Sequence, residues 1–70
     1  MDAAYRAAVR ATPEPLLHSP EEAAMMLRTS RSGVYGLIRR GELKSVKVGK
    51  LRRITRAELE AYVARLEAAR

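Results

Sequence analysis

The residues best suited to chemistry in this chain are lysines and arginines gathered in its middle. Residues 28–56 carry ten basic side chains against a single acid, Glu42, whereas the segments on either side are slightly acidic. A surface that only keeps a protein soluble would mix the two signs of charge. A segment of nearly uniform positive charge instead favours a polyanion as its partner, because many phosphates can neutralise many cations at once.

Other kinds of chemistry are poorly represented. The chain contains no cysteine and one histidine, His18, which predicts no disulfide, no metal site and no cysteine nucleophile. We interpret His18 as a solvated residue ahead of a helix, Glu58 as the closing residue of a helix-capping box, and Glu60 as a solvated helix residue. No glycine-rich phosphate loop or nucleophile motif occurs either. The sequence therefore predicts a protein that is not an enzyme and that binds no metal or cofactor.

The length of 70 residues and the composition predict one small basic domain. No run of residues is long and apolar enough to span a membrane. The N-terminus also lacks the basic segment followed by an apolar segment that is typical of a signal peptide. We therefore expect a cytoplasmic protein with no membrane partner. Pro13 and Pro15 would break a helix that began near the N-terminus. Residues 1–15 are therefore predicted to form a flexible leader, and residues 16–70 the folded domain.

Two helices joined by a short turn are predicted to position the basic residues. Ser19 and Glu22 form a capping box for a first helix that ends near Leu27. Ser30 is the expected N-cap of a second helix that ends at Arg40, after a three-residue turn. The apolar face of this second helix is formed by residues three and four positions apart: Val34, Leu37 and Ile38.

A hairpin is predicted to follow the second helix. Gly41 suits the position just after a helix end, and Gly49 suits a tight turn. Residues 44–48 and 51–55 alternate apolar and polar side chains, which is typical of two short strands. Because an isolated hairpin is only marginally stable in water, its apolar face is expected to pack on the helices.

A third helix is predicted over residues 56–68, begun by a second capping box of Thr55 and Glu58. An apolar stripe runs along it, formed by Leu59, Tyr62, Val63 and Leu66. Two helices around a tight turn, followed by a basic hairpin, give the predicted fold class: mainly α with a small β-hairpin. In this winged helix-turn-helix the wing is two-stranded, and a C-terminal helix completes the domain.

Five short motifs follow one another along most of the chain. They are EEAA at 21–24, SR at 30–31, VYGLIRRGEL at 34–43, VKVGK at 46–50 and ITRAELEAY at 54–62. In this order they resemble the excisionase-type DNA-binding domains, a winged helix-turn-helix family related to the MerR-type fold. The chain departs from the usual pattern of that family at Arg28, where glycine is common, and at Leu51, where a basic residue is usual.

The second helix, over 31–40, is expected to enter the major groove of duplex DNA through its N-terminal half. Arg31 and Ser32 would reach base edges there, with a phosphate as the alternative contact for Arg31. Tyr35 would either donate its hydroxyl to a phosphate or cover the edge of the core. The predicted DNA-binding residues of this helix and its cap are Ser30, Arg31, Ser32, Tyr35, Gly36, Arg39 and Arg40.

The hairpin over 44–55 is expected to act as a wing that enters the minor groove, whose potential is strongly negative over A·T-rich DNA. Lys47, Lys50 and Arg53 are its predicted DNA contacts, with Lys50 at the tip. Arg53 is preferred to its neighbour Arg52, which shares a strand face with an apolar residue.

The resemblance implies a function without bond-breaking. A protein of this family would act as a recombination directionality factor, or excisionase, that bends attachment-site DNA and assists an integrase in excision. Binding in cooperative head-to-tail arrays is expected, since one domain of this size covers little DNA. Two alternatives remain: a small single-domain transcriptional regulator of the MerR-like type, and a scaffold module that binds a protein through Leu51 or the alanine face of the last helix.

Overall fold

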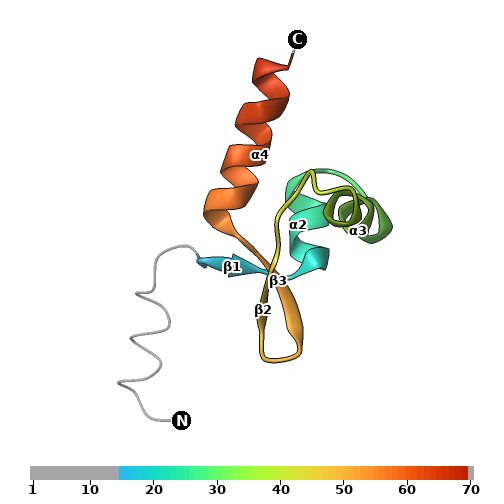
Figure 1. Cartoon of the computed structure of the whole chain (residues 1–70), viewed down its shortest axis with the longest axis vertical. Helices are drawn as coiled ribbons and strands as arrows, with labels where there is room; N and C mark the ends of the chain where they lie inside the picture. The colour runs from blue at the N-terminus through green and yellow to red at the C-terminus, as the bar shows by residue number, and fades with distance from the viewer. Residues whose placement is uncertain (1–14, 70) are drawn as a thin grey trace.

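The structure is a computed structural model that describes residues 15–69. The predicted leader lies outside the described residues except for Pro15, so the division at residue 15 stays a prediction. Three helices and a three-stranded antiparallel sheet make up the described part of the chain (Figure 1). In chain order the elements are β1 (Leu17–His18), α2 (Pro20–Met26), α3 (Arg31–Arg39), β2 (Val46–Val48), β3 (Leu51–Thr55) and α4 (Arg56–Ala68).

The predicted starts of α2 and α3 are confirmed by their caps. The Ser19 hydroxyl accepts a hydrogen bond from the Glu22 N–H at 3.1 Å, and the Glu22 carboxylate accepts one from the Ser19 N–H at 2.7 Å. At α3, the Ser30 hydroxyl accepts from the Gly33 N–H at 3.0 Å. Each cap satisfies backbone donors that the first turn of a helix leaves unpaired, and removing one typically costs about 1 kcal/mol. Both helices end one residue earlier than predicted.

A tight turn over residues 27–30 joins α2 to α3. Arg28 adopts the left-handed conformation there, with a φ of 59°, which costs a residue with a Cβ roughly 1–2 kcal/mol. The Thr29 N–H donates to the Ala24 carbonyl at 2.8 Å and closes the end of α2. The Thr29 hydroxyl then fills the space beside α3, since a Cβ at Gly33 would lie 2.5 Å from it. The tightness of the turn therefore explains the glycine at position 33.

The sheet has one strand more than the sequence predicts. The strands lie in the order β1-β3-β2 and both pairs are antiparallel, so β3 is central. In β1, His18 pairs with Ile54 and is buried, with 7% of the residue exposed. The predictions of a two-stranded sheet and of a solvated His18 are therefore wrong. A strand of two residues is too short to show the alternation by which strands are predicted from sequence.

The core is small and lies between α2, α3 and β3, with one contribution from α4. Its buried apolar residues are Ala23, Ala24, Val34, Leu43, Ile54 and Leu59. Of the predicted stripe on α4, Leu59 is buried, whereas Val63 and Leu66 are 40% and 54% exposed. Figure 1 shows the reason: α4 starts at the end of β3 and projects beyond the α2–α3 pair. The predicted stripe is therefore covered only as far as Tyr62, which is partly buried against the core.

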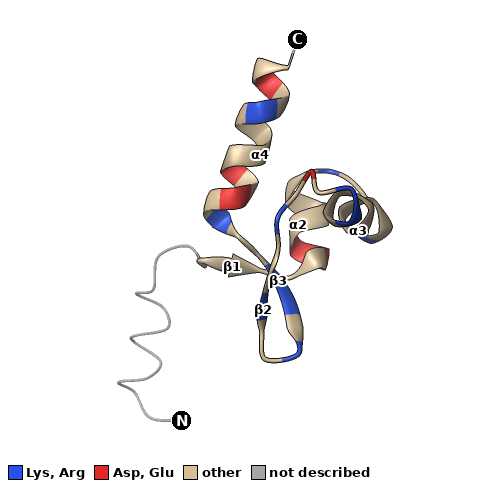
Figure 2. Cartoon of the chain, viewed as in Figure 1, with Lys and Arg blue, Asp and Glu red and all other residues tan. Residues whose placement is uncertain are grey.

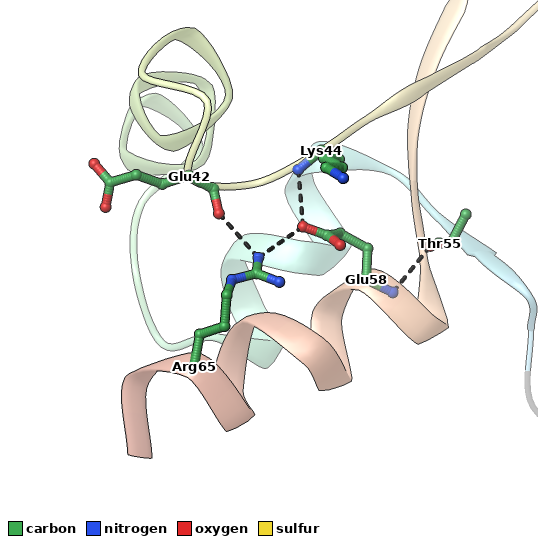
Figure 3. A network of polar contacts seen from close by, with 5 residues as sticks. All are labelled: Glu42, Lys44, Thr55, Glu58 and Arg65. Carbon is green, nitrogen blue, oxygen red and sulfur yellow. Dashed lines mark hydrogen bonds and ion pairs between the residues drawn. The ribbon is translucent and has the colours of Figure 1, made fainter. Parts of the chain in front are cut away.

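A polar network fixes α4 to the segment between α3 and β2 (Figure 3). The Thr55 hydroxyl accepts from the Glu58 N–H at 3.0 Å, as predicted. The Glu58 carboxylate, however, accepts from the Lys44 N–H at 2.9 Å and from Nη2 of Arg65 at 2.8 Å, and Arg65 also donates to the Glu42 carbonyl at 3.1 Å. The hydrogen bond from Lys44 is the main cause that lowers the pKa of Glu58. The second capping box is therefore only half formed, and Glu58 is instead a tertiary link.

Candidate nucleic-acid interface

Basic residues gather on α3, on the hairpin of β2 and β3, and on the links between these elements (Figure 2). The same view shows acidic residues on α2 and both signs of charge on α4. The basic segment of the sequence is thus divided in the folded molecule between α3 and the hairpin.

The first turn of α3 faces solvent, whereas its apolar face packs into the core. Val34 is fully buried, as predicted, while Arg31 and Ser32 are exposed. Ser30 is engaged as the N-cap through Gly33, and its hydroxyl also lies 3.2 Å from that of Ser32. Arg31 and Ser32 are therefore accessible from solvent at the start of α3, and their contacts with DNA stay a prediction.

The guanidinium of Arg31 is held by two neighbours. Its Nε donates to Oε2 of Glu21 at 2.5 Å, and its Cζ lies 4.9 Å from the centroid of the Tyr35 ring. The hydrogen bond with Glu21 is the main cause that raises the pKa of Arg31 and lowers the pKa of Glu21, so both groups are charged at neutral pH. The charge of Arg53 on β3 also lowers the pKa of Glu21. Residues of α3 and of the hairpin therefore lie within electrostatic reach of one carboxylate on α2.

Three more predicted residues lie toward the end of α3. Gly36 is buried, and a Cβ there would lie 3.2 Å from Nη1 of Arg40, so the Arg40 side chain lies over it. Nε of Arg40 donates to the carboxylate of Glu42 at 2.6 Å. Arg39 is exposed, and no acid within residues 15–69 pairs with it. Of the two arginines, Arg39 is thus the one without an acidic partner within residues 15–69.

The hairpin places two cations face to face. Lys47 pairs directly with Arg52 across β2 and β3, and like charges in such a position destabilise a sheet. Nη1 of Arg52 donates to the Ser45 hydroxyl at 2.6 Å, a neutral partner. At the turn, Gly49 has a φ of 63° and Lys50 beside it is exposed. An anion bound along this face would relieve the repulsion between the two cations.

Arg52 and Arg53 project to opposite faces of β3, and both are partly buried. Nη1 of Arg53 donates to the carbonyl of Arg52 at 2.8 Å, so this guanidinium folds back along its own strand. The preference for Arg53 over Arg52 as a DNA contact stays a prediction. The contact of Glu21 with Arg31 is not predictable from the sequence, because residues ten positions apart do not face each other on one helix and these two lie on different helices.

A metal site and a membrane-spanning helix are both absent from the described part of the chain. Within residues 15–69, no group of three or more histidine, aspartate or glutamate side chains is placed to hold a metal ion. No helix in that range combines the length and the hydropathy needed to cross a bilayer.

The architecture and the comparisons with known proteins agree. Residues 19–67 match the helix-turn-helix domain family, so the chain belongs to this family of DNA-binding domains. Over 59 residues it is 44% identical to a protein of Saccharopolyspora erythraea described as "Probable excisionase". The matched stretch covers 84% of this chain and 60% of that protein. The chain thus spans less than two thirds of the length of this relative. No solved structure matches the chain.

Proposed function

We propose that the chain is a winged helix-turn-helix protein that binds duplex DNA sequence-specifically and serves as a recombination directionality factor. The observation that supports DNA as the ligand is the dense positive charge of residues 28–56, whose one acid, Glu42, already pairs with Arg40. The similarity to a protein described as a probable excisionase supports the biological role. In that role the protein bends attachment-site DNA, breaks no bond and assists an integrase.

In the proposed complex α3 lies in the major groove. Arg31 at its start donates two hydrogen bonds to O6 and N7 of a guanine, a contact that discriminates against other bases by about 1–3 kcal/mol. Ser32 and Tyr35 lie beside it on the same exposed part of the helix and contact neighbouring bases or phosphates. Arg39 and Arg40, at the other end of α3, bind the DNA backbone.

The hairpin acts as the wing in this proposal. Lys50 stands beside the turn and enters the minor groove, while Lys47 contacts the backbone from one face of the hairpin and Arg53 from the opposite face. Because Lys47 faces Arg52, a phosphate near both would remove a repulsion and add charge-assisted hydrogen bonds. Contacts of this kind orient the protein on DNA without reading its sequence.

The salt dependence of binding tests the electrostatic part of the proposal. If about five to seven phosphates are neutralised, a plot of log Kobs against log salt should have a slope of about −5 to −6. Fluorescence anisotropy of a labelled duplex, measured over a range of potassium chloride concentrations, gives this slope. A slope near zero would show that binding does not depend on phosphate contacts and would refute the proposal.

Footprinting tests the biological role. An excisionase protects repeated sites within attachment-site DNA next to an integrase gene, and it raises the yield of excision in the presence of that integrase. A transcriptional regulator would instead protect a promoter and leave excision unchanged. Protection of a promoter alone would therefore retain DNA binding but reject recombination as the function.

A further inference from the structure

We propose that Glu21 is a positioning residue that makes Arg31 selective for guanine. The inference rests on the proposed function and concerns a residue outside the predicted DNA-binding set. Glu21 lies in the first turn of α2, and Arg31 is the first residue of α3, ten positions later in the chain. Their side chains meet through Nε of Arg31 and Oε2 of Glu21, 2.5 Å apart.

The contact uses only part of the donor capacity of the guanidinium. Arginine has five N–H donors in one rigid plane, and a carboxylate bound at Nε leaves Nη donors for a bidentate contact with guanine. The Tyr35 ring restrains the same group from its face, with its centroid 4.9 Å from Cζ of Arg31. Arg31 is therefore oriented before DNA arrives, and less side-chain freedom is lost on binding.

The carboxylate also disfavours the wrong contact. A phosphate that approached Arg31 would come near the negative charge of Glu21, which stays ionised because the hydrogen bond from Arg31 lowers its pKa. A guanine edge carries no net charge and does not meet this repulsion. Glu21 thus weakens binding to random DNA and favours the cognate base.

The ion pair is not what holds α2 against α3. The side chains of Arg31 and Glu21 are 63% and 56% exposed, and exposed ion pairs contribute little to stability. The two helices pack through Ala23, Ala24 and Val34, which are buried. A merely structural role for the pair would therefore leave the selectivity of DNA binding unchanged.

The test measures the ratio of two affinities for each variant. One duplex is selected from a random library by the wild-type protein, and the other is the same duplex with its G·C pairs exchanged for A·T. Glu21→Gln removes the charge, Glu21→Asp keeps the charge but shortens the side chain, and Glu60→Gln is a matched control at an exposed acid on α4. We expect both Glu21 variants to lower the ratio about fivefold or more, and the control to leave it unchanged. Glu21→Gln should also tighten binding to the exchanged duplex.

The background of Arg31→Ala makes the test specific, because Glu21 can act on selectivity only through Arg31. In that background, E21Q should leave the ratio unchanged. If E21Q tightens both duplexes equally and E21D keeps the wild-type ratio, Glu21 contributes charge alone and the inference is overturned. If selection by the wild-type protein yields no preferred sequence, it is the proposed sequence-specific function that fails. Thermal unfolding midpoints, expected to match the wild type, check that each variant is folded.

Discussion

Replacing Glu58 on α4 should lower the free energy of unfolding more than the replacement of a charged surface residue usually does. Its side chain is 13% exposed, and its carboxylate accepts hydrogen bonds from the Lys44 N–H and from Arg65. Hydrogen bonds to a charged group typically contribute about 1.5–3 kcal/mol. The bond from Arg65 contributes less than this, because the Arg65 side chain is 52% exposed. We therefore expect Glu58→Ala to lower the free energy of unfolding by about 2–3 kcal/mol in total.

A loss of this size is large for so small a domain. At roughly 0.05–0.15 kcal/mol per residue, the folded part of the chain has a total stability of about 3–8 kcal/mol. Glu58→Ala should therefore lower the midpoint of thermal unfolding by about 10–20 °C, as measured by circular dichroism. Glu60→Gln is the matched control, since its side chain is 68% exposed and pairs with Arg56 at 3.6 Å. It should change stability by less than about 0.5 kcal/mol.

The pH dependence of stability gives a second measurement. Hydrogen bonds from Lys44 and Arg65 lower the pKa of Glu58 in the folded protein, so the folded protein binds this proton less tightly than the unfolded chain. The stabilisation is fully present above the ordinary pKa of 4.5 and is lost as the pH falls through the folded value. In the Glu58→Gln variant, stability should fall less steeply as the pH is lowered. Part of the fall should remain, because the pKa values of Glu21 and Glu22 are also lowered in the folded protein. A Gln variant that followed the wild-type stability at every pH would refute the role of the network.

Two further predictions concern the site and the turn. Arg31→Ala should reduce discrimination at one base pair by about 1–3 kcal/mol, whereas Lys50→Ala should weaken binding to all duplexes alike. Identical behaviour of the two variants in competition binding would contradict separate roles for α3 and the hairpin. Gly33→Ala places a Cβ 2.5 Å from the Thr29 hydroxyl and should destabilise the domain by about 1–3 kcal/mol in urea unfolding. Adding Thr29→Ala should recover much of that loss, and an unchanged loss would mean that the turn is not its cause.

The helices are predictable from the sequence because their signals are local. Ser19 and Ser30 each stand three residues before the N–H group that they cap, so the starts of α2 and α3 follow from short patterns. Gly41 has a φ of 74° just after α3, as predicted for glycine at the end of a helix. These elements need no knowledge of the tertiary structure.

The features that the sequence does not predict depend on contacts between distant residues. β1 exists because Leu17 and His18 pair with the end of β3, and the burial of His18 follows from this pairing. Glu58 has the spacing of a capping residue, yet its carboxylate binds Lys44 and Arg65. In each case a tertiary contact determines a conformation or a partner that the neighbouring sequence does not show.

The ion pairs divide the cations of the proposed interface into two kinds. Arg31 and Arg40 each pair with an acid, which fixes their orientation. Lys47 and Lys50, by contrast, pair with no acid within residues 15–69. A cation of fixed orientation can discriminate between base edges, because that discrimination depends on geometry, whereas an unconstrained lysine can follow a phosphate. Selectivity in the proposed complex should therefore depend mainly on Arg31 in α3, whereas Lys47 and Lys50 should each contribute about one unit to the slope of the salt dependence.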